Sequence, residues 1–201
     1  MGFGDWINRK RHNRGFGIQS PSAFFFITQV LRERLPYYAY EELDRSIDQC
    51  GGMSRRGAKE LFRITNSLHP ANCIAMASEA AATAMKAARP GAHLYRPENK
   101  EVFEGTLEKC GKIGLLYIGK CHDRQEIMNS ALQYTDNDSA IIIEGIGKDN
   151  VARALWQSAI DDPRTVVTYD MYSYGLILFD SEKKKQNYKE KRKNYNKKMN
   201  N

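Results

Sequence analysis

Residues 164–179, RTVVTYDMYSYGLILF, decide the architecture of this 201-residue chain. Two runs within them, 164–170 and 175–179, are rich in the β-branched and aromatic residues that favour strands. Only four residues join the two runs, whereas a connection between parallel strands needs roughly a dozen or more residues. The two strands are therefore predicted to pair as an antiparallel hairpin.

Upstream of the hairpin, short apolar runs alternate with helical patterns. Strands are predicted at residues 73–77, 92–95, 114–118 and 140–143, and helices at about residues 78–88, 97–110, 123–134 and 150–160. This alternation is typical of right-handed βαβ crossovers and a parallel sheet. The predicted fold class is therefore α/β, a Rossmann-like three-layer sandwich whose mixed sheet ends in the C-terminal antiparallel hairpin.

The amino-terminal part of the chain has helical patterns. Ser20-Pro21 is a helix start, an N-cap followed by proline at the first helical position, and Pro36 ends that helix. Residues 37–43 open a second helical stretch, and Gly51-Gly52 breaks it before Ser54 caps another helix. The predicted organisation is an N-terminal helical extension over residues 1–53, one α/β domain over 54–181, and a tail over 182–201.

The net charge of +7 is concentrated in the tail. Residues 182–201 carry nine Lys or Arg and two Glu, while the remaining residues carry 22 charges of each sign. With almost no apolar residues, the tail is predicted to be disordered or transiently helical. It is either a solvated extension or a contact for nucleic acid or another polyanion. The candidate contact residues are Lys183, Lys184, Lys185, Lys189, Lys191, Arg192, Lys193, Lys197 and Lys198.

No apolar run reaches the roughly 18 residues that a membrane helix needs, so no membrane contact is predicted. The four cysteines are scattered, without the C-x-x-C spacing or histidine cluster of a zinc site. They are interpreted as free thiols, and no metal site is predicted. A cytoplasmic location is expected.

Four phrases carry a resemblance to a known family: HNRGFGIQSP (12–21), PYYAYEE (36–42), DPRTVVTYD (162–170) and GLILF (175–179). With them, the chain resembles the class I S-adenosylmethionine-dependent methyltransferases, in particular a bacterial O-methyltransferase-like branch. The likeness spans about residues 10–180. It implies that S-adenosylmethionine, if the chain binds it, lies at the carboxyl ends of the parallel strands.

The positions where that family binds its cofactor depart from the family pattern. The family's first strand ends in an acid and a glycine-containing loop, but residues 74–80 here contain no glycine. Its second strand ends in an acid that accepts the ribose hydroxyls, and this chain has Arg96, a pure donor. The vestigial cofactor positions that the resemblance implies are Ala75, Met76, Ala77, Ser78, Arg96, Gly119 and Glu144.

Two further departures concern a strand and a metal. Only 17 residues separate Arg96 from Gly114, where the family fits a helix, a strand and a second helix, so an edge strand and its adenine-contacting loop are predicted to be deleted. Where the family has metal-binding acids, this chain has Gly119 and Glu144-Gly145. One carboxylate does not make a divalent cation site.

These departures predict a methyltransferase-like pseudoenzyme with no assigned catalytic residue and no bound cofactor. Two alternatives stay open. One is an active methyltransferase with a rearranged cofactor pocket, and the other is a non-enzymatic binding module that contacts a polyanion through the tail. Residues 14–20 and 37–42 are expected near the carboxyl ends of the parallel strands, because ligands bind there in this architecture.

Overall fold

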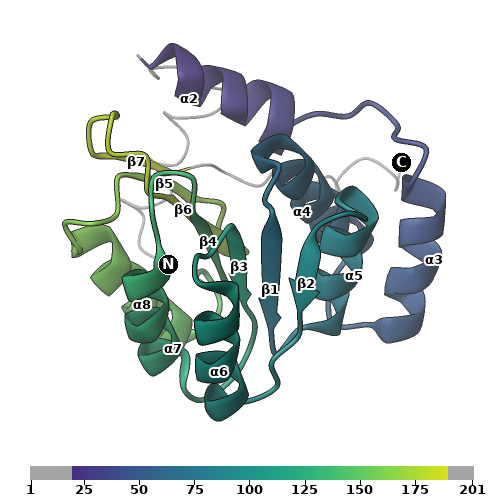
Figure 1. Cartoon of the computed structure of the whole chain (residues 1–201). Coiled ribbons are helices and arrows are strands. Elements are labelled where there is room, and N and C mark those ends of the chain that lie inside the picture. Colours follow the sequence, from purple (N-terminus) through teal and green to yellow (C-terminus); the bar gives the residue numbers. More distant parts are fainter. Residues whose placement is uncertain (1–19, 190–201) are drawn as a thin grey trace.

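A computed structural model describes residues 20–189 of the chain (Figure 1). The helical elements are α2 (Pro21–Phe25), the π-helix η2 (Phe26–Leu31), α3 (Tyr40–Cys50), α4 (Arg55–Leu68), α5 (Glu79–Ala88), α6 (Lys100–Cys110), α7 (Arg124–Ala131), the 3₁₀ helix η3 (Leu132–Tyr134) and α8 (Asn150–Asp161). The strands are β1 (Asn72–Met76), β2 (His93–Tyr95), β3 (Leu115–Ile118), β4 (Ala140–Glu144), β5 (Val167–Asp170), β6 (Tyr174–Leu178) and β7 (Gln186–Lys189).

The strands form one mixed sheet in the order β2-β1-β3-β4-β6-β5-β7. Strands β1 to β4 run parallel, and β6 runs antiparallel to both β4 and β5. The predicted hairpin and the predicted α/β class are therefore confirmed. The six predicted strands all occur, with ends that differ by no more than three residues.

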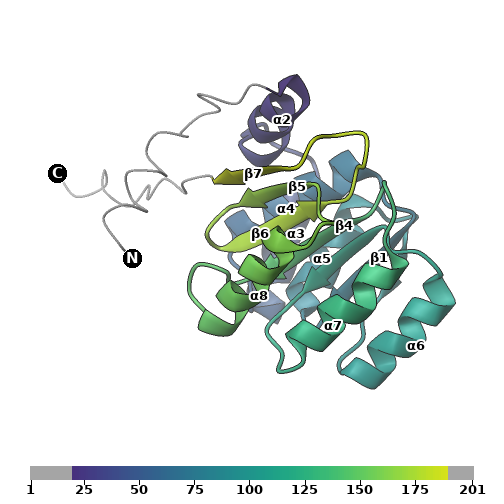
Figure 2. The same ribbon diagram turned by 90° about the vertical axis from the view of Figure 1, so that its left-hand side faces the viewer.

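Helices cover both faces of the sheet, which gives three layers (Figures 1 and 2). One apolar cluster joins alternate strand residues to α3, α4 and α5. A second cluster joins the intervening strand residues to α6, α7 and α8. Because both faces are buried, the central strands β3 and β4 are apolar almost throughout, as expected for parallel strands under two helical layers.

The structure agrees with the prediction that no further strand lies between β2 and β3. Between β2 and β3 the chain forms one helix, α6, and β2 pairs only with β1 among the described strands. The sheet therefore ends at a strand of three residues. Such a short strand offers few unpaired backbone groups to a neighbouring chain.

The tail differs from its prediction, since residues 186–189 form β7 rather than a disordered segment. This strand pairs in parallel with β5, with Tyr169 opposite Tyr188. The two tyrosine rings stack with centroids 5.3 Å apart, and Thr168 Oγ1 donates to Asn187 Oδ1 at 2.8 Å. The polar segment 186–189 is therefore ordered by its pairing with the edge of β5 and by the stacking of Tyr188 on Tyr169. The predicted contact residues Lys191, Arg192, Lys193, Lys197 and Lys198 lie outside the described residues.

The amino-terminal extension is helical, as predicted, but its start lies elsewhere than expected. Ser20 lines a hollow with Leu68, which precedes β1, and with Val167, the first residue of β5. It therefore lies at the amino ends of the strands, and its predicted place at the carboxyl ends is wrong. Residues 14–19 are outside the described residues.

Residues 37–42 pack against the helical layer. The rings of Tyr37 and Tyr40 contact Phe62 of α4 with centroid distances of 5.4 and 5.5 Å. Tyr38 and Glu42 line a hollow of about 570 Å³ that runs along α5 and reaches Arg96. Residues 37–42 therefore share a hollow with Arg96, at the carboxyl end of β2, but they pack against the helices and do not cover the ends of the strands.

The buried Arg63 fixes the π-helix to the domain. Its Nε donates to Val30 O at 2.7 Å and its Nη2 to Leu31 O at 3.1 Å. These carbonyls lie at the end of η2, where helices leave acceptors without intrahelical partners. One guanidinium therefore satisfies both.

Within the described residues, no helix has the length and apolarity needed to cross a membrane.

Candidate site at the carboxyl ends of the parallel strands

The turn from β1 into α5 is built without glycine. Ala77 follows β1 with a φ of 52°, a left-handed conformation that residues other than glycine rarely adopt. Its amide donates to Pro97 O at 3.2 Å. Ser78 then caps α5 by accepting from Ala81 N at 3.2 Å. The turn keeps the backbone shape of a glycine loop and places a methyl group on its exposed side.

Gly119 closes the end of β3 against this turn. Its amide donates to Met76 O at 2.9 Å. A Cβ at this position would lie 2.7 Å from both Met76 O and Ala77 O, closer than any real Cβ contact. Glycine is therefore required here because two backbones touch, and the carboxyl ends of β1 and β3 are in direct contact at this point.

Arg96, at the end of β2, forms an ion pair with the first residue of α5. Its Nη1 donates to both carboxylate oxygens of Glu79, at 2.6 and 2.7 Å. Both side chains are more than half exposed, so the pair contributes little to stability. It does, however, place a cation where the family pattern has an acceptor, and it engages both oxygens of the nearby carboxylate.

Glu144 is the carboxylate that ends β4, and it lies half-buried beside Tyr117 of β3. The Tyr117 hydroxyl donates to the carboxylate. Burial raises the pKa of Glu144, while Arg124 and the hydrogen bond from Tyr117 act in the opposite direction. Burial, together with the nearby Glu144, holds the pKa of Tyr117 well above its usual range. Both groups line a hollow of about 290 Å³ between α4, β4 and the loop before β6.

A buried cation supports the loop that follows β3. Arg124 is 1% exposed; its Nε donates to Gly119 O at 2.8 Å and its Nη1 to Asp149 Oδ2 at 3.0 Å. Asp149 also caps α8 by accepting from Val151 N at 2.9 Å. Backbone hydrogen bonds from Val151 and Ala152 and the charge of Arg124 lower the pKa of Asp149. This pair therefore ties the end of β3 to the start of α8.

The structure brings six of the seven predicted site positions together at the carboxyl ends of the strands. Met76, Ala77, Ser78 and Gly119 meet at the β1–β3 contact, and Arg96 and Glu144 flank it at the ends of β2 and β4. The side chain of Ala75 instead packs in the apolar cluster under α4 and α5.

Sequence reasoning missed Tyr117, Arg124 and Asp149. Asp149 carried a usable signal, an aspartate just before a helical pattern. Tyr117 lies in an apolar strand, where it reads as a core residue. Among residues 20–189, no three His, Cys, Asp or Glu side chains are placed to hold a metal ion.

Comparison with solved structures identifies the fold. The SAH-bound methyltransferase PaMTH1 of Podospora anserina superposes with a TM-score of 0.54 and 12% identity, over 81% of this chain and 97% of that one. The O-methyltransferase TomG of Streptomyces achromogenes, in complex with SAM, gives 0.51 and 10%, over 85% and 98%. The chain has the class I S-adenosylmethionine-dependent methyltransferase fold. No protein-family model and no curated protein sequence matches it.

In this fold, S-adenosylmethionine would lie against the residues described above, and their chemistry does not suit it. The ribose hydroxyls of S-adenosylmethionine need acceptors, and Arg96 offers only donors. The methionine part needs close approach to backbone amides, and the amides of Ala77 and Gly119 donate to Pro97 O and Met76 O. These residues do not fit the cofactor in the arrangement that the family pattern implies.

Proposed function

We propose that this protein is a methyltransferase-fold pseudoenzyme that neither binds S-adenosylmethionine nor transfers a methyl group. The observation that carries the proposal is the Arg96–Glu79 ion pair at the end of β2. It reverses the charge at the ribose position and occupies the adjacent carboxylate. The protein then acts as a scaffold through its surface, and its four free cysteines support a cytoplasmic location.

The expected loss of affinity for S-adenosylmethionine is the sum of several lost contacts, each of which contributes a few kcal/mol to the binding free energy. Micromolar binding corresponds to about 8 kcal/mol. A hydrogen bond to a charged group contributes roughly 1.5–3 kcal/mol, so losing the ribose acceptor and the backbone donors of the β1 turn removes most of that binding energy. The deleted strand, with its adenine-contacting loop, removes a further contact surface.

Calorimetry of the full chain with S-adenosylmethionine and S-adenosylhomocysteine tests this proposal. We expect no saturable heat at millimolar ligand, while PaMTH1, measured in parallel, binds. A cooperative denaturation transition in the same sample verifies that the protein is folded. A micromolar dissociation constant would overturn the proposal.

A rearranged but active enzyme is the second candidate, favoured by the pairing of Glu144 with Tyr117. A half-buried carboxylate of raised pKa in a hollow can accept a proton from a substrate hydroxyl. This candidate requires methyl transfer from S-adenosylmethionine that falls strongly in Glu144→Gln and is retained in Glu101→Gln, an exposed control on α6.

A further inference from the structure

A separate hollow lies at the amino ends of the strands, opposite to the candidate site. It encloses about 470 Å³ between α2 and η2, the last turn of α4, the start of β5 and the loop from β6 to β7. Figures 1 and 2 both show α2 lying next to β7. The segment between Ser20 and Leu31 therefore forms one wall of a space whose other walls belong to the α/β domain.

The interior of this hollow is apolar. Its wall on the helical side is formed by Phe25 and Phe26, and its wall on the domain side by Leu68, Val167 and Leu178. Below them lies an aromatic stack in which Tyr169 contacts both Phe26 and Tyr188 with centroids 5.3 Å apart. Burial raises the pKa of Tyr169, so its hydroxyl stays uncharged. An alkyl chain would find hydrocarbon contacts along this space.

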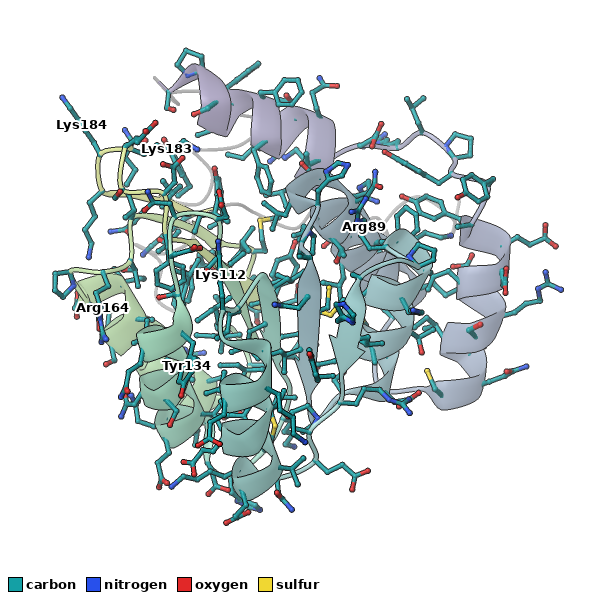
Figure 3. The ribbon with its side chains drawn as sticks, viewed as in Figure 1. Arg89, Lys112, Tyr134, Arg164, Lys183 and Lys184 are labelled. Carbon is teal, nitrogen blue, oxygen red and sulfur yellow. The ribbon has the colours of Figure 1, made fainter. Side chains whose placement is uncertain are left out.

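The polar groups that line the hollow are hydroxyls, an amide and cations. Lys183 and Lys184, on the loop between β6 and β7, line it, and no described carboxylate does. Lys183 also pairs with Asp180 at 2.8 Å. In Figure 3 Lys184 extends from this loop into solvent. Lys183 therefore already has a carboxylate partner, whereas Lys184 forms no ion pair among the described residues and can meet an anion at this edge of the hollow.

Two features of the helical wall are unusual for a surface without a binding role. Phe25 is 62% exposed and Phe24 is 46% exposed, on a helix of five residues. The next six residues form a π-helix, a conformation that is rare and frequently found at functional sites. Exposed aromatic residues beside an apolar hollow are typical of a ligand or interaction surface.

We propose that this hollow binds a free fatty acid, with the alkyl chain between η2 and β5 and the carboxylate at Lys184. Charge complementarity and the apolar lining favour this occupant over a neutral or cationic one. The site lies at the opposite end of the sheet from the cofactor positions. It is therefore independent of whether the protein binds S-adenosylmethionine.

Calorimetry of the full chain with octanoate, decanoate and dodecanoate tests the proposal. Each buried methylene should strengthen binding about fourfold until the hollow is filled. Octanol, the uncharged partner of octanoate, should bind more weakly than octanoate. Saturable binding at one site with this order supports the proposal, and no saturable binding overturns it.

Substitutions locate the site. Ser67 lies exposed on the hollow's lining, and Ser67→Trp should abolish decanoate binding because the indole fills the space. Lys184→Gln should weaken binding several-fold, whereas Lys109→Gln, on the distant helix α6, should leave it unchanged. Equal affinity in all three variants, each checked for a normal denaturation transition, would place binding elsewhere and overturn the proposal.

Vesicles of phosphatidylglycerol distinguish a free fatty acid from a membrane surface. We expect decanoate to bind and the protein not to sediment with the vesicles. Sedimentation with vesicles in the absence of decanoate binding would assign the exposed Phe24 and Phe25 to a lipid surface and overturn the proposal.

Discussion

Ala77 combines a side chain with a backbone conformation that usually needs glycine. Its φ of 52° is left-handed, and its methyl group is exposed. Ala77→Gly therefore removes strain without leaving a cavity, and we expect it to stabilise the fold by about 0.5–1 kcal/mol. Chemical denaturation measures the difference. As a control, Ala84→Gly, at a buried position in the interior of α5, should instead destabilise by about 1 kcal/mol or more; destabilisation by both would contradict the strain argument.

Glu144 predicts a stability that depends on pH. Burial raises the pKa of its carboxyl above the ordinary value of 4.5, so between these two values the folded protein holds a proton that the unfolded chain has released. This contribution to stability is present below 4.5 and is lost as the pH rises through the folded pKa.

Glu144→Gln tests this dependence, because glutamine cannot ionise and can still accept a hydrogen bond from Tyr117. As the pH rises from about 4, the natural protein should lose unfolding free energy relative to Glu144→Gln, because the aspartates of lowered pKa contribute equally to both proteins. The exposed control Glu101→Gln should keep the natural slope. Identical slopes for all three proteins would show that burial does not perturb Glu144.

At the residue scale, the sequence identified which side chain had changed but not what it contacts. Arg96 could be predicted to reverse the charge at the end of β2. Its partner Glu79 could not, because the pairing depends on how the first turn of α5 is rotated against β2. Tyr117 was hidden for a similar reason, since its hydroxyl meets Glu144 only after β3 and β4 are in register.

At the element scale, apolar runs located six strands and could not locate β7. Its sequence QNYK has one aromatic residue and no alternation that marks a strand. The strand forms because the edge of β5 offers unpaired backbone groups and because Tyr188 stacks on Tyr169.

The late start of β5 has a local cause: Thr165 donates its hydroxyl to Ala159 O at 2.7 Å, which keeps residues 164–165 in the turn after α8.

The strand β7 changes the expected effect of shortening the tail. Removing residues 182–201 should lower the melting temperature, because it deletes a strand and the Tyr169–Tyr188 stack. Removing residues 190–201 should leave the melting temperature close to that of the full chain. Tyr188→Ala should cost about 1–2 kcal/mol, whereas Tyr38→Ala, at a ring that is 97% exposed, should cost little. Equal melting temperatures for the two truncations would mean that β7 adds no stability.

At the scale of the whole molecule, positive and negative charges balance over residues 1–181, which carry 22 of each sign. Three of the five cations labelled in Figure 3 also have carboxylate partners: Lys112 pairs with Asp136, Arg164 with Asp162 and Lys183 with Asp180. The ordered domain therefore offers little field to a polyanion. Any such binding should depend most on residues 190–201, which carry five of the nine cations of the tail.

This dependence predicts a steep response to salt. Each phosphate neutralised on duplex DNA contributes about 0.9 to the log–log slope of affinity against salt, so five cations allow a slope of roughly 4 to 5. Fluorescence anisotropy with a labelled duplex measures the slope for the full chain and for residues 1–189. We expect the shorter chain to lose most of the affinity and most of the slope, with little preference among sequences in either protein. If the shorter chain keeps tight, sequence-selective binding at high salt, recognition lies in the domain and the tail is not the binding element. Paired side chains such as Arg164 and Lys112 would then have to exchange their carboxylate partners for the phosphates of the ligand.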